Sequence, residues 1–308
     1  MKKKLLITPK SYFEIKEEML PLLEGYEVIF NDTGQTFTED DMLELAKDVE
    51  GIIIGIDSIT KKVIDNAENL KAISKYGVGM DNIDVKAARE KGILLDNTPN
   101  TNNVSVAELA IGLMFNIARN ISYSVSEVKN LKWKRIKGVE LTDKKLGLVG
   151  CGNIGKEVTR RAYGLGMRIK VYDPYFNDPD FSKEYNIELV DLDTLLSTSD
   201  FISLHLPLNE ETEDFISKRE LEKMKNSAFL INTSRGGLIS ENSLLWALKE
   251  GEIAGAASDV FSKEPPGDNS LLAMDNFILT PHIGANTVES VRRMATRATE
   301  NLLEMLNK

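Results

Sequence analysis

The sequence predicts an α/β protein made of two doubly wound domains, each with a parallel sheet that is covered by helices on both faces. Short apolar runs of strand length alternate with amphipathic stretches of helix length along nearly the whole chain. The runs are apolar throughout instead of at every second position, which is typical of parallel strands buried on both faces. A length of 308 residues suits two domains of ordinary size.

Five apolar runs in the first third of the chain predict the sheet of the first domain. The strands are expected at residues 4–8, 27–31, 51–56, 71–76 and 93–97. The first run follows a lysine-rich N-terminus, but it is too short for a signal peptide and is interpreted as a strand. Thr38 is expected to cap a helix with an acidic first turn, because a hydroxyl acceptor and negative charge both suit that end of a helix.

Six further runs predict the sheet of the second domain, in the same alternation with helices. These strands are expected at residues 145–150, 168–173, 201–206, 228–233, 253–260 and 277–280. No linker rich in proline, serine or glycine separates the two series. The chain passes instead through a helix expected at residues 105–120, which is apolar on more than one side.

Two interpretations of this helix stay open. It can pack between two domains or against a second subunit, or it can be an ordinary core helix. From the first interpretation we predict a homodimer built on residues 105–120, because one core does not easily cover every face of such a helix.

Composition and charge exclude several classes of partner. A formal net charge of −10 leaves no basic surplus for nucleic acid or an anionic membrane surface. No run approaches the roughly 18 apolar residues that a membrane-spanning helix needs. The one cysteine, Cys151, excludes an internal disulfide and a cysteine-based metal site, and no metal is expected. We therefore expect a cytoplasmic protein that acts on a small molecule.

The segment KLGLVGCGNIGKEV carries the pattern Gly150-x-Gly152-x-x-Gly155 between a predicted strand and a predicted helix. Such glycines allow a tight turn and let backbone amides, including those of Asn153 and Ile154, approach a pyrophosphate. Asp173 ends the next predicted strand, where a carboxylate binds the adenosine ribose hydroxyls and repels a 2′-phosphate. The alternative is a glycine turn without a ligand. The full pattern favours NAD as the cofactor.

Beyond this pattern the chain resembles the D-isomer-specific 2-hydroxyacid dehydrogenase family over nearly its whole length. The resemblance is carried, in this order, by KYGVGMDNID, NTPNTNNVSVAE, GCGNIG with VYDP, HLPLNEET, INTSRGGLI, ASDVFSKEP and PHIGANT. Within the family the chain is most similar to short forms of D-3-phosphoglycerate dehydrogenase. Since it ends at Lys308, we expect no C-terminal regulatory domain.

The resemblance implies a flavodoxin-like substrate-binding domain at residues 1–99 and 284–308, and an NAD-binding Rossmann domain at residues 100–283. It also implies that Arg235, Glu264 and His282 are catalytic. Arg235 would bind the substrate carboxylate, for which a guanidinium offers two charge-assisted hydrogen bonds. His282 would transfer the proton of the C2 hydroxyl, and Glu264 would hold the His282 ring. Taken alone, His282 would be interpreted as structural; its two partners favour catalysis.

Further binding residues are implied at other predicted strand ends. The substrate-binding residues would be Lys75, Tyr76, Val78, Gly79 and Asn102, with the amides of Val78 and Gly79 at the carboxylate. Asp259 would bind the nicotinamide carboxamide, and His205 and Thr233 would line the same pocket. Each of these could also be a strand-end residue without a direct role.

One departure from the family pattern bears on the substrate. Phosphoglycerate dehydrogenases commonly have an arginine that helps to hold the substrate phosphate where this chain has Asp57. Lys75 could supply the missing cation, so oxidation of D-3-phosphoglycerate, a step of serine biosynthesis, is the first expectation. The alternatives are a glyoxylate, hydroxypyruvate or D-lactate-type reductase and, in another class, a non-enzymatic NAD-sensing binding module.

Overall fold

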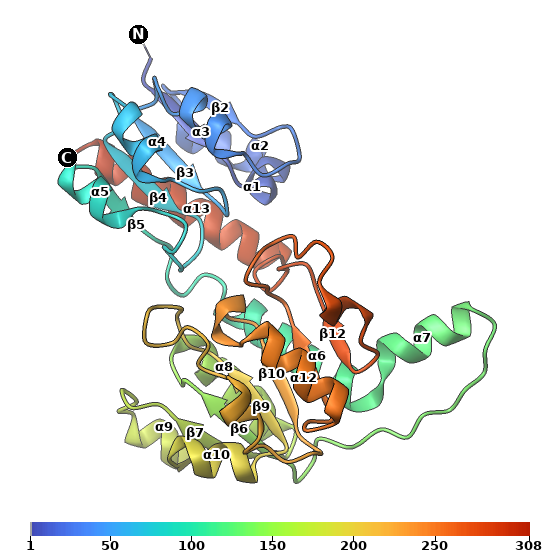
Figure 1. Ribbon diagram of the computed structural model, residues 1–308. Coiled ribbons are helices and arrows are strands. Elements are labelled where there is room, and N and C mark those ends of the chain that lie inside the picture. The colour runs from blue at the N-terminus through green and yellow to red at the C-terminus, as the bar shows by residue number, and fades with distance from the viewer. Residues whose placement is uncertain (1) are drawn as a thin grey trace. The chain divides into compact units, whose positions relative to one another are not determined.

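The computed structural model describes residues 2–308, which form two compact units. Unit 1 comprises the chain up to Asn102 together with Ala285–Lys308, and unit 2 comprises Asn103–Gly284. The boundaries expected from the sequence, after residues 99 and 283, lie close to these. Both units have a parallel sheet with helices packed on it, which confirms the predicted fold class (Figure 1).

Unit 1 is built on a five-stranded parallel sheet with the order β2-β1-β3-β4-β5. Its strands are β1 (Lys4–Ile7), β2 (Glu27–Phe30), β3 (Gly51–Ile54), β4 (Ala72–Lys75) and β5 (Leu94–Asp96). This is the strand order of flavodoxin-like sheets. The central strands β3 and β4 are buried at every position, as their continuous apolar runs predict.

Helices pack on this sheet, and one of them comes from the C-terminal end of the chain. They are α1 (Lys10–Glu14), α2 (Lys16–Met19), the 3-10 helix η1 (Leu20–Leu23), α3 (Glu39–Leu45), α4 (Lys61–Asn66), α5 (Val85–Glu90) and α13 (Val288–Leu306). Helix α13 packs against β3 and β4 (Figure 1). Thr38 caps α3 as predicted, since its hydroxyl accepts a hydrogen bond from the amide of Asp41.

Unit 2 is built on a seven-stranded parallel sheet with the order β12-β11-β10-β9-β6-β7-β8. Its strands are β6 (Lys145–Val149), β7 (Arg168–Tyr172), β8 (Glu188–Leu189), β9 (Phe201–Leu204), β10 (Phe229–Asn232), β11 (Gly255–Ser258) and β12 (Phe277–Leu279). The direction of the order reverses between β6 and β9, where doubly wound sheets bind dinucleotides. The sequence did not predict β8, because its two exposed residues form no apolar run.

The helices of unit 2 vary widely in length. They are α6 (Asn103–Arg119), α7 (Ile121–Lys129), α8 (Asn153–Gly164), α9 (Pro179–Glu184), α10 (Leu192–Thr198), α11 (Lys218–Leu221), α12 (Glu241–Glu250), and the 3-10 helices η2 (Gly236–Leu238) and η3 (Ser270–Ala273). Within residues 2–308, no single helix is long and apolar enough to cross a membrane. Only α6 and α7 taken together, with a 61° bend between them, have the length and composition of a membrane span.

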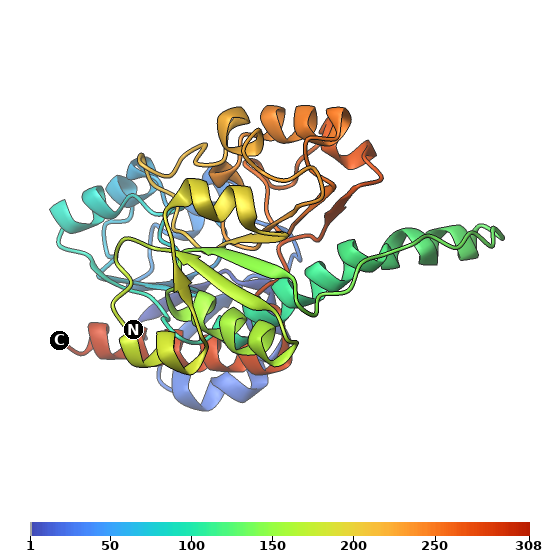
Figure 2. The same ribbon diagram turned by 90° about the horizontal axis from the view of Figure 1, so that it is seen from below.

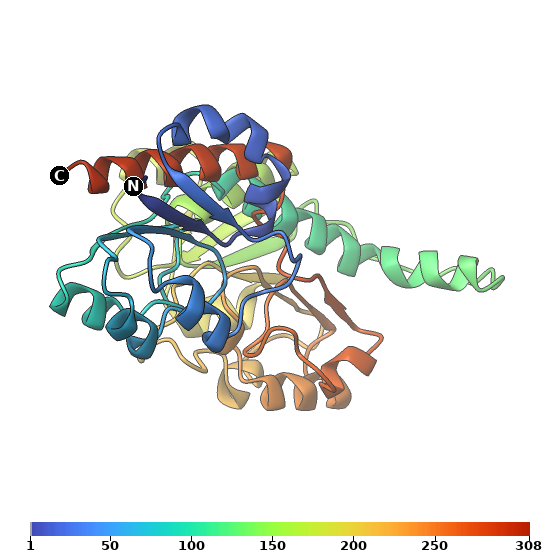
Figure 3. The same ribbon diagram turned by 90° about the horizontal axis from the view of Figure 1, so that it is seen from above.

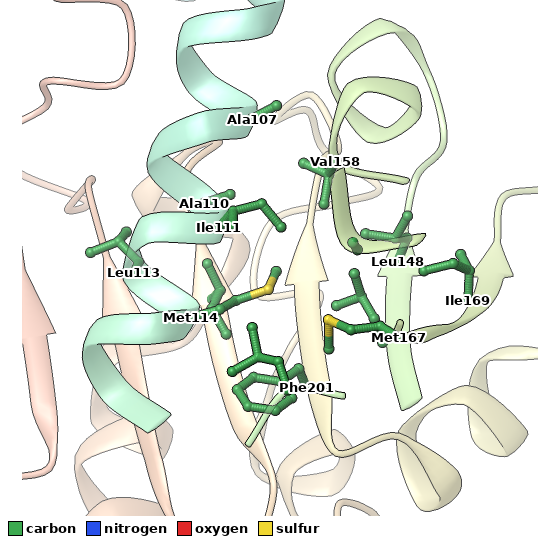
Figure 4. Close-up of a cluster of buried hydrophobic side chains, with 14 of the residues drawn as sticks. Ala107, Ala110, Ile111, Leu113, Met114, Leu148, Val158, Met167, Ile169 and Phe201 are labelled. Atoms are coloured by element: carbon green, nitrogen blue, oxygen red, sulfur yellow. The ribbon is translucent and has the colours of Figure 1, made fainter. Parts of the chain in front are cut away.

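Helix α6, the predicted apolar helix, is a core helix of unit 2. Ala110, Ile111 and Met114 belong to one buried cluster with Val158 of α8 and Phe201 of β9 (Figure 4). Its neighbours are α8 and the strands β10, β11 and β12. Of the two interpretations made from the sequence, the ordinary core helix is therefore the one that the packing supports.

An arm within residues 121–140 extends away from the rest of unit 2 (Figures 2 and 3) and returns to α6 at Val139, whose amide donates to the carbonyl of Ala118 at 2.9 Å. The arm consists of α7 and the segment after it. No residue of α7 is buried. Ile121, Val125 and Val128 repeat at helical spacing and are about half-exposed, and the following Leu131 and Trp133 are 96% and 81% exposed. The arm thus presents apolar side chains that unit 2 itself does not cover.

Candidate active site

The predicted site residues of unit 2 all follow strands at the same edge of its sheet. The glycine loop follows β6, Asp173 follows β7, and His205 follows β9. Arg235, Glu264 and His282 follow β10, β11 and β12, which are neighbours in the sheet. Because the strands are parallel, their carboxyl ends meet at one edge, and ligands of open α/β sheets bind there.

The three glycines of the loop after β6 differ in why the structure has a glycine at that position. Gly150 has φ +92°, and an added Cβ would lie 2.6 Å from the carbonyl oxygen of His205. A Cβ on Gly155 would lie 2.5 Å from the carbonyl oxygen of Gly150. Gly152 is the N-cap of α8, and no atom lies within 4 Å of its added Cβ. Gly150 and Gly155 therefore allow close backbone contacts within the loop. Gly152 leaves space beside the amides of Asn153 and Ile154, which begin α8.

Asp173 is held against this loop by backbone donors. Its carboxylate accepts hydrogen bonds from the amide of Cys151 at 2.8 Å and from the amide of Tyr175 at 2.9 Å. Four lone-pair positions serve a carboxylate, so acceptor capacity remains for ligand hydroxyls. The thiol of Cys151 is buried, which raises its pKa to about 11, so Cys151 is a small core residue and not a nucleophile.

Two buried polar atoms on the neighbouring loops have no hydrogen-bond partner among residues 2–308. They are Nδ1 of His205 and Oγ1 of Thr233. The other ring nitrogen of His205, Nε2, lies 3.0 Å from the hydroxyl oxygen of Ser203. Burial lowers the pKa of His205 to about 4, so its ring is neutral at ordinary pH. With the open glycine loop and Asp173, these unpartnered atoms fit a bound dinucleotide.

His282 and Glu264 form a hydrogen-bonded pair. Nδ1 of His282 lies 2.6 Å from Oε2 of Glu264, and Oε1 of Glu264 accepts the amide of Phe261 at 3.0 Å. Burial acts to raise the pKa of Glu264, but the hydrogen bond and charge of His282, that amide and the charge of Arg235 together lower it. The carboxylate is therefore ionised and Nδ1 carries a proton, while Nε2 has no hydrogen-bond partner among residues 2–308 and the side chain is 40% exposed.

The backbone of His282 has φ +52°, which is uncommon for a residue with a side chain. Asp259 holds this conformation. Its carboxylate accepts Oγ1 of Thr280 at 2.5 Å, the amide of Ile283 at 2.9 Å and the amide of Gly284 at 2.7 Å, and its carbonyl accepts the amide of His282 at 2.9 Å. Asp259 was expected to bind the carboxamide of the nicotinamide. This local role could not be predicted from the sequence, because its four donors come from residues 280–284, which follow a different strand.

Arg235 is placed by a close backbone contact. An added Cβ on the next residue, Gly236, would lie 1.9 Å from the carbonyl carbon of Phe261. This contact brings the loop after β10 against the loop that carries Glu264. The backbone carbonyl of Arg235 accepts a hydrogen bond from Nδ2 of Asn232 at 2.7 Å. Nη1 of the Arg235 side chain donates to the carbonyl of Ser234 at 2.8 Å. Gly236 was not singled out from the sequence, although the Arg-Gly-Gly motif contains it.

The predicted substrate residues of unit 1 lie at the end of β4 or in the segments that follow β4 and β5. Val78 is exposed, whereas the Tyr76 hydroxyl points into the core and lies 3.1 Å from the hydroxyl oxygen of Ser11. Asn102 is the last residue of the first of the two segments that make up unit 1. Its Oδ1 has no hydrogen-bond partner among residues 2–308. Lys75 is buried, and its ammonium donates to the carbonyl of Gly55 and to Oδ1 of Asn82, both at 2.6 Å.

Within the part of the chain that the structure describes, no three His, Cys, Asp or Glu side chains are grouped so that they could hold a metal ion. The chemistry available at the site is therefore that of a histidine–carboxylate pair next to a guanidinium, beside a loop suited to a dinucleotide.

Comparisons with known proteins agree with this geometry. Residues 111–284 match the family model described as D-isomer specific 2-hydroxyacid dehydrogenase, NAD binding domain. The chain is 42% identical over 307 residues to D-3-phosphoglycerate dehydrogenase of Methanocaldococcus jannaschii, covering 98% of this chain and 57% of that one. It is 43% identical over 280 residues to hydroxypyruvate reductase of Thermotoga maritima, covering 89% and 90%. The chain thus spans little more than half the length of the first of these relatives.

A solved structure is also similar over nearly the whole chain. It is D-lactate dehydrogenase from Aquifex aeolicus complexed with NAD and lactic acid, at 28% identity and a TM-score of 0.84, covering 98% of this chain and 95% of that one. Together with the matched NAD binding domain, this confirms the predicted cofactor, NAD.

We predict that Gly236→Ala destabilises unit 2, because its Cβ meets backbone that does not yield easily. The free energy of unfolding should fall by about 1–3 kcal/mol, the usual cost of overpacking. Gly237→Ala is the matched control, since its Cβ meets only the flexible side chain of Leu208, at 3.1 Å. Urea unfolding of both variants measures the difference, and equal stabilities would contradict the proposed backbone contact.

Proposed function

Because the chain belongs to the D-isomer-specific 2-hydroxyacid dehydrogenase family, we propose that it catalyses the NAD-dependent interconversion of a 2-hydroxy acid and its 2-keto acid. The observation that carries this proposal is the His282–Glu264 pair, joined at 2.6 Å on the loops next to that of Arg235. A protein that only senses NAD has no need of this pair, which disfavours the non-enzymatic binding module.

The proposed chemistry divides between cofactor and protein. NAD, when bound, would supply the acceptor for the hydride that leaves C2 as the hydroxy acid is oxidised. Arg235 binds the substrate carboxylate, and Nε2 of His282 takes the proton of the C2 hydroxyl as the carbonyl forms. Glu264 keeps the proton on Nδ1 and stabilises the charged ring that results. In the reverse direction His282 returns the proton to the oxygen.

We propose the following contacts for the cofactor. The pyrophosphate binds the amides at Gly152, Asn153, Ile154 and Gly155, and the adenosine ribose binds Asp173. His205 and Thr233 line the nicotinamide side, which their unpartnered Nδ1 and Oγ1 support. Asp259 uses three acceptor positions within its own unit, so one lone pair remains for the carboxamide.

Two substrate classes have support. The motif resemblance and the name of the relative from Methanocaldococcus jannaschii support D-3-phosphoglycerate, whose oxidation would serve serine biosynthesis. The hydrogen bonds of Lys75 support an unphosphorylated acid such as hydroxypyruvate or glyoxylate. The deciding experiment is a panel of 2-keto acids assayed by loss of the reduced-nicotinamide absorbance. No turnover with any of them would reject the dehydrogenase.

We further propose that the protein is a cytoplasmic homodimer. The surface expected at residues 105–120 is largely occupied by the core of unit 2, so we place the contact on the arm. A helix of nine residues is unstable alone in water, and its uncovered stripe of Ile121, Val125 and Val128 needs a partner surface.

We predict that His282→Ala lowers kcat by roughly 10²–10⁴, the usual share of general acid–base catalysis. Oxidation of the hydroxy acid should become faster with rising pH in the wild type, because His282 must accept a proton, and this dependence should flatten in the variant. The dissociation constant of NADH, measured by fluorescence titration, is the control and should change little. Turnover within a few-fold of the wild type would make His282 structural.

We predict that the enzyme prefers NAD to NADP. The Asp173 carboxylate is fixed by two amides, so it cannot easily turn away from a 2′-phosphate, and like charges repel. Asp173→Ala should reduce the preference, because it weakens the binding of NAD and removes the repulsion of the 2′-phosphate of NADP. Comparison of kcat/KM for the two cofactors measures this, and a wild-type preference for NADP would contradict the role of Asp173.

We predict that the double variant Leu131→Asp, Trp133→Asp sediments as a monomer near 34.4 kDa, whereas the wild type sediments as a dimer. Leu272→Asp is the control, because Leu272 is also exposed but lies outside the arm. Sedimentation velocity at micromolar concentration distinguishes them. A wild-type monomer, or a dimer that survives the double variant, would contradict the arm as the contact.

A further inference from the structure

Two charged side chains lie buried at the carboxyl edge of the unit 1 sheet. Asp57 follows β3 and is 2% exposed, and Lys75 ends β4 and is 7% exposed. Buried charges are costly unless they are hydrogen-bonded or paired. The partners of these two residues therefore decide whether either one is available to a ligand.

Lys75 joins the loop after β3 to the loop after β4. Its ammonium donates to the carbonyl of Gly55 and to Oδ1 of Asn82. Nδ2 of Asn82 donates to the same Gly55 carbonyl at 2.9 Å and also to the carbonyl of Asp57. Four groups thus share one compact network: the side chains of Lys75 and Asn82 and the carbonyls of Gly55 and Asp57.

Asp57 fastens the same loop on its other side. Its carboxylate accepts the hydroxyl of Thr8, at the end of β1, and the amide of Phe37 at 2.7 Å. The hydroxyl oxygen of Thr8 in turn accepts the amide of Gly55 at 3.1 Å. Asp57 therefore points into the unit and ties the loop after β3 to two neighbouring segments.

The segment held by this network is the glycine loop Gly77–Gly79. Gly77 has φ +125°, and its amide donates to Oγ1 of Thr98 at 2.8 Å. The carbonyl of Val78 accepts Nδ2 of Asn97 at 2.8 Å. The amides of Val78 and Gly79 donate to no acceptor among residues 2–308. These two amides are therefore the donors that the loop can offer to an anion.

At this edge the exposed side chains include two apolar ones, Ile56 and Val78, and the carboxylate of Asp81, which follows the glycine loop. Ile56, between the buried Gly55 and Asp57, is 62% exposed, and Val78 is 43% exposed. An apolar surface next to two amides suits a carboxylate that carries a small uncharged substituent. It does not suit a dianionic phosphate, which needs compensating cations.

We propose that Lys75 and Asp57 are positioning residues that hold the carboxylate-binding amides of Val78 and Gly79, and that the substrate is an unphosphorylated 2-hydroxy acid whose C3 group meets Ile56. This proposal rests on the dehydrogenase function proposed above. It also explains why this chain has Asp57 where phosphoglycerate dehydrogenases commonly have a phosphate-binding arginine. The aspartate binds no phosphate and instead holds the loop after β3 in place.

The first test compares hydroxypyruvate with 3-phosphohydroxypyruvate on the wild-type enzyme. We expect kcat/KM for hydroxypyruvate to be higher by about tenfold or more, since the phosphate would be desolvated without the charge-assisted contact that it needs. A preference for the phosphorylated acid would overturn the substrate class. Absence of turnover with either acid and with glyoxylate would instead reject the dehydrogenase function itself.

The second test separates positioning from phosphate binding. Lys75→Met and Asn82→Ala should each raise KM for both acids by the same factor, about tenfold for one lost hydrogen-bonded contact, with kcat and NADH affinity nearly unchanged. Asn82→Ala keeps the lysine charge, so it remains informative if Lys75→Met does not fold. Lys10→Ala is the matched control, because Lys10 is an exposed lysine that follows β1. A rise in KM confined to the phosphorylated acid, in either lysine variant, would overturn the proposal.

Discussion

The geometry of the candidate active site depends on the parallel pairing of β10, β11 and β12. The register aligns Asn232 with Ser258, and Ser258 with Leu279. The three strands therefore end at the same level, and the loops that follow them begin next to one another. Arg235, Glu264 and His282 lie far apart in the sequence, and only this hydrogen-bonded row brings them to the same edge. Loss of pairing at β12 would remove His282 from Glu264 without touching either side chain.

The sheet fixes the loops only coarsely, and local hydrogen bonds supply the remaining accuracy. Asp259 turns the chain at His282 by accepting three donors from residues 280–284. Burial raises the pKa of Asp259, while these donors oppose the rise. Gly236 lets the loop of Arg235 lie directly on the backbone of Phe261. Side chains held by such supports keep their geometry without a ligand, which would limit the entropy lost on substrate binding if they have the proposed catalytic role.

Much of this arrangement could be predicted from residue patterns alone. Continuous apolar runs predicted eleven of the twelve strands, because strands buried on both faces need such runs. The missed strand, β8, pairs only at an edge and carries no apolar run. The glycine loop and Asp173 were predicted because their chemistry depends on short spacings. The role of Asp259 and the contact at Gly236 were not, because both depend on atoms that come from other loops. The packing of α6 was undecided for the same reason, since an apolar helix face does not say which surface covers it.

Residue type is a weaker guide to function than the state of a residue's hydrogen bonds. Lys75 and His282 both lie at strand ends, and both were expected to contact the substrate. Lys75 is buried, and its ammonium donates to the carbonyl of Gly55 and to Oδ1 of Asn82. His282 has one nitrogen fixed by Glu264, while the other has no partner among residues 2–308, and its side chain is 40% exposed. A group held on one side and open on the other can exchange a proton at little cost, whereas removing a charge from a satisfied buried network leaves its partners unpaired. Asp57 and Asp173 each accept two hydrogen bonds. Burial separates them, since Asp57 is 2% exposed whereas Asp173 is only partly buried and keeps acceptor positions for a ligand.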